Sequence, residues 1–529
     1  MSARMWRRTA SIALLSAALP SSAQAAPGWL QSGLLSHGGD LRGVGFGRGG
    51  GSQVLYGDTP GLGEDNALTF ERSVRRIPPD GPWRAPEPSG LPPGLRQVSI
   101  NGSGSAVAWR QGFDPESPLV VSSFGTASRR DPGGWSAPLT LATRTHAAEV
   151  VLMENGEALA AWSTTDGAVF AALRGRFGDW RPPKRLEAPG SSTQPLPIVA
   201  VNEAGDAVVV WERGPAGRAR IRAATRQASL TQPPLPFAAT RTLPGPVGRA
   251  APSSAALDRE GDAVVAWSLA RGSFVSDHRS GASRWGPARP LTSVPGPVVS
   301  VAAGGGAVAL GSVGVSGSIA VAVRAASGGP WRRVPGPPPS ACCLVGALVT
   351  RLGDVLVAGT TAQFDDLQVF RRAAGSRRWV RAPLRIDQGY RQQVTEMASN
   401  AAGDLVVAWN WNPSNTSKPL YAASYQAVAP PVLNGALRPS PATLRPGGAL
   451  CLRFPLTRSG RVLITLRRPF GLRGLAAFTV VGRRGANTVT VPRAALARLL
   501  GPGRYIVTAE TGSRRPGGFR AAEVRLLAG

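Results

Sequence analysis

One hairpin is written several times along this chain, and that repetition limits the possible fold more than any other feature. The stretch VNEAGDAVVVWER covers Val201–Arg213, LDREGDAVVAW covers Leu257–Trp267, and SNAAGDLVVAW covers Ser399–Trp409. Each places a turn containing Asn or Asp and Gly before an apolar run that ends on Trp. Such turn residues tolerate the positive φ angles that tight hairpins require. Self-similarity of this kind predicts a repeat architecture.

The apolar run recurs at a nearly constant distance from residue 56 to residue 409. The residues that end it are Tyr56, Trp109, Trp162, Trp211, Trp267, Leu310, Gly359 and Trp409. The mean spacing is about 50 residues, which is typical of propeller blades and longer than helical solenoid repeats. The repeat therefore predicts eight units.

Each unit contains four strand-like segments that differ in polarity. A short strand such as Gln97–Ile100 or Ile198–Val201 precedes the turn, and a third strand such as Ile221–Thr225 follows the apolar run. The last segment is rich in Gly, Trp, Pro and Arg, as in GDWRPPKRL, and suits an exposed edge. The run itself is apolar at every position, so both of its faces must be covered. We therefore predict an all-β fold, a β-propeller of eight four-stranded blades, with seven blades as the alternative.

The two ends of the predicted ring complement each other. The eighth unit has three strands up to Gln426 but no Trp segment, whereas PGWLQSGLL at Pro27–Leu35 precedes the first unit. We expect Pro27–Leu35 to pair with Leu420–Gln426 and close the ring. Before it, residues 1–25 have the basic, apolar and Ala-x-Ala regions of a signal peptide, which predicts a secreted or cell-surface protein. The propeller is assigned to residues 26–430.

The amino-acid composition changes after residue 430. Residues 431–529 hold 17 Arg against Glu510 and Glu523, a net charge of +15 out of +29 for the whole chain. Their alternating pattern predicts a small Ig-like β-sandwich, in which Tyr505 of LLGPGRY is the corner tyrosine. We expect an anionic surface polymer to bind its arginine pairs: Arg467, Arg468, Arg483, Arg484, Arg514 and Arg515.

Two resemblances follow from these motifs. The strand–turn–Ala-Val-Trp units and the Gly-Trp-x-x-Pro segments resemble repeats of secreted bacterial β-propeller proteins of unassigned function, over about residues 26–430. The C-terminal region resembles bacterial Ig-like modules appended to surface proteins. The first resemblance implies a fold and carries no agreed activity.

Motifs that would indicate an enzyme or a cofactor are each better explained as strands or turns of the repeated unit. GFGRGG at Gly45–Gly50 precedes a strand-like segment, whereas a dinucleotide fingerprint precedes a helix. RRIPPD at Arg75–Asp80 is slightly similar to the arginine segment of sialidases, but the turn spacing departs from the Asp-box of that family. Asp258, Glu260 and Asp262 have oxygen ligands suited to calcium, although turn chemistry also explains them.

The remaining reactive residues form no recognisable catalytic set. His37, His146 and His278 are far apart in sequence, and no GxSxG elbow occurs. Cys342, Cys343 and Cys451 lack metal-ligand spacing; one disulfide bridge is the alternative to buried thiols. We predict no metal and no cofactor. Trp109, Trp162, Trp211, Trp267 and Trp409 are interpreted as packing residues rather than sugar-stacking platforms.

These observations favour an exported, non-enzymatic binding propeller. A glycan or a protein is the expected partner class for the propeller face. The alternative is a glycoside hydrolase of sialidase-like type, which requires carboxylates and arginines from several blades to converge.

Overall fold

The computed structural model describes residues 28–527 except for segments between strands, the longest being residues 59–69 and 382–391. All named elements in the described part of the chain, β1 to β41, are strands. No helix among these residues is long and apolar enough to cross a membrane. The predicted signal peptide, residues 1–25, lies outside the described residues.

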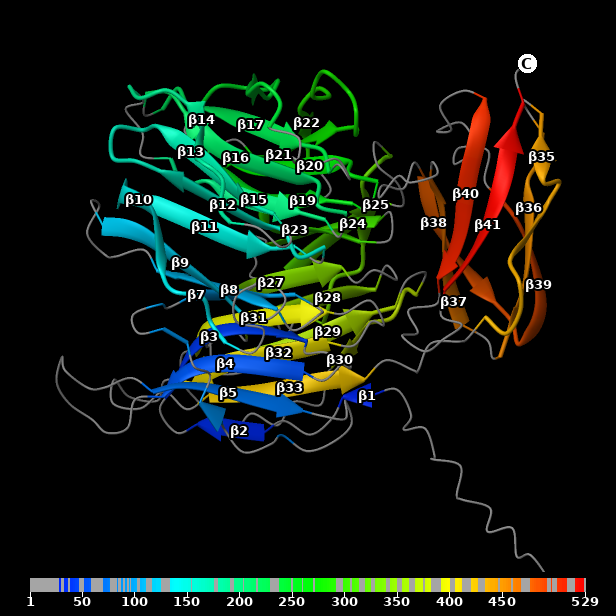
Figure 1. Ribbon diagram of the computed structural model, residues 1–529, viewed down its shortest axis with the longest axis horizontal. Helices are drawn as coiled ribbons and strands as arrows, with labels where there is room; N and C mark the ends of the chain where they lie inside the picture. The colour runs from blue at the N-terminus through cyan, green and yellow to red at the C-terminus, as the bar shows by residue number, and fades with distance from the viewer. Residues whose placement is uncertain are drawn as a thin grey trace, which may run out of the picture.

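Eight antiparallel sheets are described up to Gln426 (Figure 1). We number them in chain order. Sheet 1 contains β3 (Gly39–Phe46), β4 (Ser52–Asp58), β5 (Phe70–Arg76) and β6 (Glu87–Pro88), and sheet 2 contains β7 (Gln97–Ile100), β8 (Ala106–Arg110), β9 (Ser117–Phe124) and β10 (Leu139–Thr145). Sheet 3 contains β11 (Ala147–Leu152), β12 (Ala158–Ser163), β13 (Val169–Arg174) and β14 (Lys184–Glu187), and sheet 4 contains β15 (Ile198–Val201), β16 (Ala207–Arg213), β17 (Arg220–Arg226) and β18 (Arg241–Thr242).

Sheets 5 to 8 follow the same order. Sheet 5 contains β19 (Ala251–Leu257), β20 (Ala263–Leu269), β21 (Gly272–His278) and β22 (Arg289–Pro290), and sheet 6 contains β23 (Val298–Gly304), β24 (Ala307–Val313), β25 (Ile319–Arg324) and β26 (Arg332–Val334). Sheet 7 contains β27 (Cys343–Val349), β28 (Val355–Thr360), β29 (Leu367–Arg372) and β30 (Val380–Arg381). Sheet 8 contains β31 (Gln392–Ser399), β32 (Leu405–Trp411) and β33 (Leu420–Gln426), together with β1 (Gly28–Trp29) and β2 (Gly33–Ser36).

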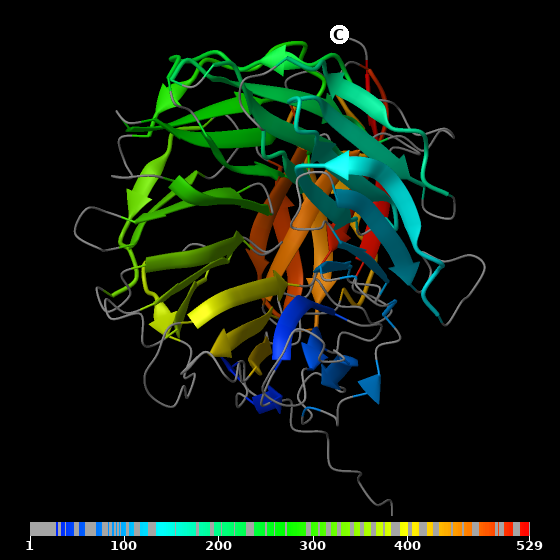
Figure 2. The same ribbon diagram turned by 90° about the vertical axis from the view of Figure 1, so that its left-hand side faces the viewer.

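The sheets stand around a ring, as in a propeller (Figure 2). The first strand of each sheet lies against the first strand of the next, from β3 through β7, β11, β15, β19, β23 and β27 to β31. Strand β31 in turn lies against β3, so the series returns to its start. The Pro- and Arg-containing fourth strands are the outer ones, as their sequences indicate.

The core lies between the sheets. On β16, Ala207, Val209 and Trp211 pack against sheet 3, while Val208 and Val210 pack against sheet 5. Side chains alternate between the two faces of a strand, so a strand that is apolar throughout contributes to two interfaces. The described residues form one such cluster at each of the eight interfaces between neighbouring sheets, including the interface of sheets 8 and 1, where Val406 and Ala408 meet Val54 and Tyr56.

The N-terminal strands complete sheet 8. Gly28 and Trp29 of β1 pair with Gln426 and Tyr425, and β2 pairs with the earlier part of β33, where Leu34 lies opposite Tyr421. The two N-terminal strands therefore take the place of the missing fourth strand at the outer edge of β33. This pairing removes the open edge that would otherwise be left where the chain ends its circuit.

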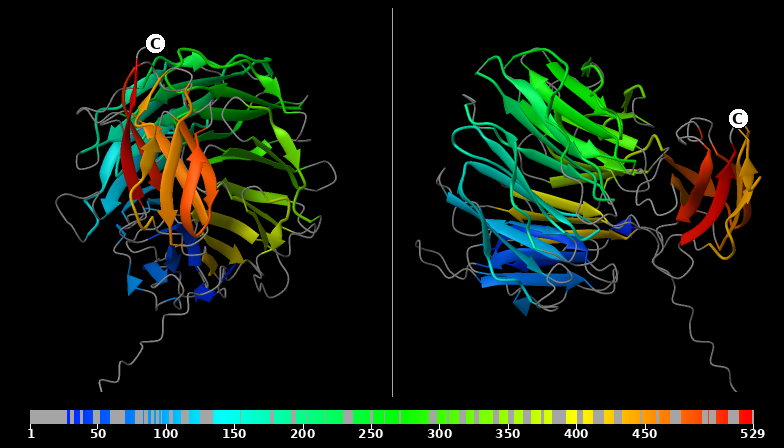
Figure 3. Two further views of the ribbon diagram at one scale, coloured as in Figure 1. Left: turned by 90° about the vertical axis from the view of Figure 1, so that its right-hand side faces the viewer. Right: turned by 45° about the horizontal axis from the view of Figure 1, so that its top comes forward.

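The C-terminal residues form two sheets beside the ring (Figure 3). One contains β34 (Arg438–Ser440), β36 (Cys451–Leu456) and β39 (Gly485–Thr490). The other contains β35 (Thr443–Leu444), β41 (Phe519–Leu526), β40 (Gly503–Glu510), β37 (Gly460–Arg467) and β38 (Ala476–Gly482). Leu452 and Phe454 from the first sheet and Ile464 and Val507 from the second share one apolar core. This arrangement is a β-sandwich, and its Ig-like topology stays a prediction.

Burial of the repeated Trp residues leads to a stability prediction. Trp211 is fully buried and Trp267 is 2 % exposed. We expect Trp211→Ala and Trp267→Ala each to lower the free energy of unfolding by about 3–5 kcal/mol, because each leaves a cavity between sheets. Chemical denaturation measures the change. Val380→Ala, at a side chain that is 61 % exposed, is the control and should change the value by less than about 0.5 kcal/mol. Wild-type stability in both Trp variants would show that these rings are not packing residues.

Candidate functional site

The turns between the first and second strands are held by side chains that also reach the next sheet. In the turn of sheet 4, Gly205 has a φ of +94°, and Oδ1 of Asn202 accepts hydrogen bonds from the N–H groups of Ala204 and Asp206 at 3.0 and 2.9 Å. Nδ2 of Asn202 donates to the carbonyl of Asp258 in sheet 5, at 2.9 Å. In sheet 2, Asn101 donates in the same way to the carbonyl of Met153 in sheet 3, at 3.1 Å. The repeated turn residue thus links neighbouring sheets.

Asp258 and Asp262, in the turn of sheet 5, accept hydrogen bonds from backbone N–H groups. The backbone N–H of Asp262 donates to Oδ1 of Asp258 at 2.9 Å, and the N–H of Ser280 donates to Oδ1 of Asp262 at 2.8 Å. Among the residues that the structure describes, no group of three His, Cys, Asp or Glu side chains could hold a metal ion.

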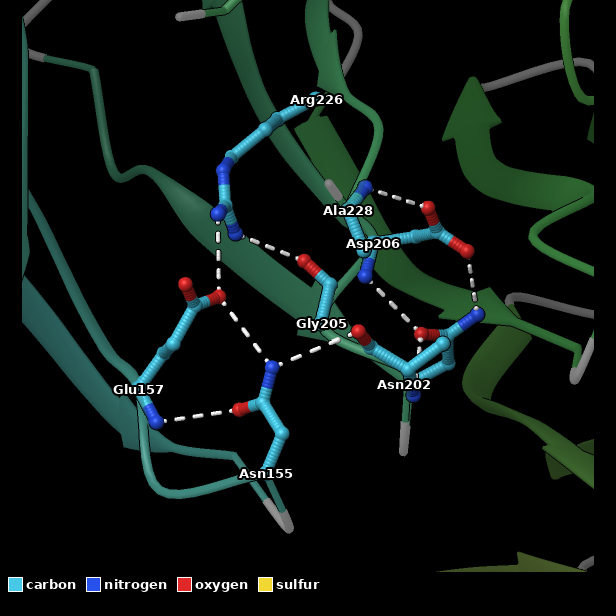
Figure 4. A network of polar contacts seen from close by, with 8 residues as sticks. Asn155, Glu157, Asn202, Gly205, Asp206, Arg226 and Ala228 are labelled. Carbon is cyan, nitrogen blue, oxygen red and sulfur yellow. Dashed lines mark hydrogen bonds and ion pairs between the residues drawn. The ribbon is translucent and has the colours of Figure 1, made fainter. Parts of the chain in front are cut away.

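An arginine at the end of the third strand connects sheets 3 and 4 (Figure 4). Nη1 of Arg226 donates to the carbonyl of Gly205 at 2.7 Å, and Nη2 lies 2.9 Å from Oε2 of Glu157, in the turn of sheet 3. The Arg226 side chain is fully buried. Asn155 donates to the same Glu157 oxygen at 3.2 Å and to the carbonyl of Ala204 at 3.3 Å. A buried charge held by this many partners fixes how one sheet sits on the next.

The last residue of the third strand is a buried Arg or His in other sheets as well. Arg324 forms an ion pair with Asp277 and lies over the Trp331 ring, at 4.9 Å from its centroid. His278 lies against Trp285, with ring centroids 5.0 Å apart. Arg174, Arg226, Arg324 and Arg372 are all at most 8 % exposed. The sequence interpretation missed this set, although an Arg or His closes the third strand in AALR, AATR, VSDH, VAVR and VFRR.

At the other end of the sheets the tryptophans pack against the third strand. Trp162 stacks on Phe170, Trp267 on Phe274 and Trp409 on Tyr421, with ring centroids 5.8–6.1 Å apart. In each pair the Trp on the second strand is the direct cross-strand partner of the aromatic residue on the third strand. Trp211 lies opposite Arg222 instead. These four Trp rings are buried between sheets.

Two glutamates on first strands bridge to the neighbouring first strand. Oε2 of Glu149 on β11 accepts a hydrogen bond from the N–H of Val199 on β15, at 2.7 Å. Glu396 on β31 accepts one from the N–H of Val44 on β3. Burial raises the pKa of each carboxyl group to about 7, and the backbone hydrogen bond only partly opposes this. No local sequence motif marks either residue.

Other predicted site residues are not brought together. Gly45 begins the GFGRGG motif in β3 and is followed by strand β4, so the motif is part of a hairpin and not a dinucleotide fold. A Cβ atom on Gly45 would lie 2.6 Å from Cβ of Ile100, which explains the glycine by close approach of β7. Arg75 and Arg76 are the last two residues of β5, and residues 77–80 of the sialidase-like segment lie outside the described residues.

The C-terminal arginine pairs are only partly described. Arg483 and Arg484 are exposed at the turn between β38 and β39, and Arg467 ends β37. Arg468, Arg514 and Arg515 lie outside the described residues, as does Cys342. Tyr505 is buried on β40, opposite Val524. Cys451 is a free thiol, with Sγ 3.7 Å from Oγ1 of Thr490.

The raised pKa values predict a pH dependence of stability. Between pH of about 4.5 and 7, Glu149 and Glu396 hold protons in the folded state that the unfolded chain has lost, so stability falls as the pH rises through this window. Each residue accounts for up to about 3 kcal/mol, reduced by its partial exposure. Glu149→Gln and Glu396→Gln should flatten this fall in urea denaturation at pH 4.5 and pH 8.

Glu523→Gln is the matched control for these variants. Glu523 is exposed, and its hydrogen bond from Arg504 lowers the pKa of its carboxyl group instead of raising it. The control should leave the fall between pH 4.5 and pH 8 intact. An equal fall in wild type and in both inner-strand variants would contradict the burial of these two carboxyl groups.

Comparison with known proteins finds similarity only among solved structures. No family model matches the sequence, and no curated protein matches it. The chain is similar to the BP39L lectin from Burkholderia pseudomallei, at 16 % identity and a TM-score of 0.42, covering 66 % of this chain and 98 % of the lectin. It is similar to Sqt1 of Saccharomyces cerevisiae, at 11 % identity and a TM-score of 0.45, covering 76 % of this chain and 100 % of Sqt1. YCF48 from Cyanidioschyzon merolae matches at 13 % identity and a TM-score of 0.39, covering 75 % and 98 % of the two chains.

Proposed function

We propose that this chain is an exported, non-enzymatic binding protein that contacts an anionic polymer or surface. In this proposal residues 26–430 form an eight-bladed β-propeller closed by its N-terminal strands, and residues 431–529 form an Ig-like module that adds to the same contact. The observation that carries the proposal is the charge on the outer strands of six consecutive sheets.

These outer strands form what we call the basic rim. Every outer strand from sheet 2 to sheet 7 exposes at least one cationic side chain: Arg144, Lys184, Arg185, Arg241, Arg289, Arg332, Arg333 and Arg381. The one carboxylate on these strands is Glu187 of β14, which is buried. It is 2.9 Å from Nη1 of Arg213 and 3.0 Å from Nε of Arg222 in sheet 4. The exposed charged side chains of these strands are therefore cationic, with no exposed carboxylate among them.

The repeat explains why a polymer is the favoured partner. One or two cations recur on each sheet around the circumference, so a chain of anionic groups meets several of them in turn. Each single contact at an exposed site is weak, but several contacts on one polymer add up through their high effective concentration. The exposed Arg483 and Arg484 of the C-terminal module offer a further contact of the same kind.

A second candidate is a glycoside hydrolase, which would need the two inner-strand glutamates to act as a pair. Such enzymes use a pair of carboxyl groups, one of which needs a raised pKa to act as an acid. Glu149 and Glu396 have pKa values of about 7. Each, however, is engaged with the backbone of the next sheet, which favours a structural role. Hydrolysis of a panel of fluorogenic glycosides that is lost in Glu149→Gln and Glu396→Gln would support this candidate over the binding protein.

The binding proposal predicts a salt-dependent interaction. The full chain should bind teichoic acid and DNA at low salt and lose affinity steeply as salt is added, because counterions are released from the polymer. Replacing Arg332, Arg333 and Arg381 with Gln should lower the slope of log K against log salt for DNA by about 2–3, at roughly 0.9 per lost phosphate contact. Fluorescence anisotropy with labelled polymer measures both quantities.

The control replaces exposed arginines that are not on outer strands, Arg218 and Arg279, with Gln. If the rim makes the contact, these variants keep the wild-type slope. Equal loss of slope in the rim and control variants would show that the charge acts without a defined surface. No binding to either polymer at micromolar protein would refute the proposal.

A further inference from the structure

Arg174, at the end of β13, is a buried cation whose Nη1 atom has no hydrogen-bond partner in the described part of the chain. The residue is 5 % exposed, and its buried Nη1 atom donates no hydrogen bond to any described residue. Burial lowers the pKa of its guanidinium group, against which Asp179 acts in the raising direction. An arginine stays charged in proteins, so a guanidinium nitrogen that lacks an acceptor at this depth is costly.

The corresponding residue of sheet 4 shows which partner is normal at this position. Arg174 lies opposite Ala158 and Arg226 lies opposite Ala207, and both alanines begin the second strand of their sheet. Arg226 binds Glu157, the last turn residue of the preceding sheet. The residue that corresponds to Glu157 one sheet earlier is Ser105, which is buried and precedes Ala106 of β8. Serine is shorter than glutamate and carries no charge.

Two other sheets follow the same dependence on the preceding sheet. Asp277, from sheet 5, supplies the carboxylate for Arg324 of sheet 6. For Arg372 of sheet 7, the preceding turn is GGGA at residues 304–307 and has no acidic residue. Arg372 lies over the Trp379 ring, at 5.8 Å from its centroid, and burial lowers the pKa of its guanidinium group. Arg226 and Arg324 are each paired with a carboxylate of the preceding sheet, which comes from the turn in sheet 3 and from β21 in sheet 5.

We propose that a small carboxylate-sized anion binds Arg174 between sheets 2 and 3, where Ser105 replaces the glutamate found at the next interface. A planar oxyanion such as acetate offers the guanidinium group a carboxylate oxygen, as Glu157 does toward Nη2 of Arg226. Charge-assisted hydrogen bonds of this type are the strong ones. The site is internal and separate from the basic rim, so a failure of polymer binding leaves it untouched.

The test is thermal unfolding of the full chain in sodium acetate and in sodium chloride of equal ionic strength. A ligand that binds only the folded state raises the melting temperature in a saturable way. We expect acetate to raise it by about 1 °C over chloride, the shift that corresponds to about 1 kcal/mol in a chain of 529 residues, whose unfolding entropy is about 2.1 cal/mol/K per residue. No difference between the two salts would overturn the proposal.

Two variants make the result specific to Arg174. Ser105→Glu supplies the carboxylate from the chain, so it should melt higher than wild type without acetate and lose at least half of the acetate shift. Glu157→Ser removes the carboxylate beside Arg226 and should enlarge the acetate shift by creating a second site of the same kind. Full retention of the wild-type acetate shift in Ser105→Glu would refute the site, even if Arg174→Met, the direct deletion, fails to fold.

Discussion

The structure depends on the burial of the second strand of each sheet on both of its faces. A strand such as β16, with Val208, Val209 and Val210 fully buried, cannot be covered by its own sheet. It needs one neighbour for Ala207, Val209 and Trp211 and another for Val208 and Val210. A row of such sheets always leaves two uncovered faces, and only a closed ring leaves none. The return of sheet 8 to sheet 1, through Val406 and Tyr56, follows from this requirement.

Apolar burial alone does not set how one sheet is placed on the next, because it has little directionality. The polar contacts supply the direction. Asn101 and Asn202 donate to the turn of the following sheet, and Arg226 and Arg324 bind carboxylates of the preceding one. Glu149 binds the first strand of the next sheet. Because these charges are buried, a displaced sheet would leave them unpaired, at a cost larger than the gain from the contact itself. The buried ion pairs therefore specify the arrangement more than they add to stability.

Local patterns were sufficient to predict the repeated strands. Gln97–Ile100 and Ile198–Val201 have the predicted bounds, since each is a short strand that ends at an Asn-containing turn. The third strand predicted at Ile221–Thr225 is one residue longer at each end, as Arg220–Arg226. The buried Arg226 and Arg324 are the last residues of the third strands of their sheets. Their partners lie on other sheets, so a single repeat gives no sign that the charge is buried.

The candidate site residues were harder to predict for the same reason. Glu149 and Glu396 stand in ordinary alternating strands, and only the neighbouring sheet raises their pKa values. The acidic turn Asp258–Asp262 has calcium-like composition, but the backbone N–H groups of Asp262 and Ser280 use its oxygens. The basic rim, in contrast, follows directly from a fourth strand that is rich in Arg and Pro, once that strand is known to be the outer one.

Closure of the ring by the N-terminal strands is the central claim, and hydrogen exchange tests it most directly. Amides of β33 should be protected in the full chain, because β1 and β2 pair with its outer edge. In a chain that starts at His37, the account predicts that Leu420–Gln426 lose this protection and that the loss spreads to β32 and to β4 of sheet 1, whose core they share. Unchanged protection of β33 after removal of β1 and β2 would contradict the account.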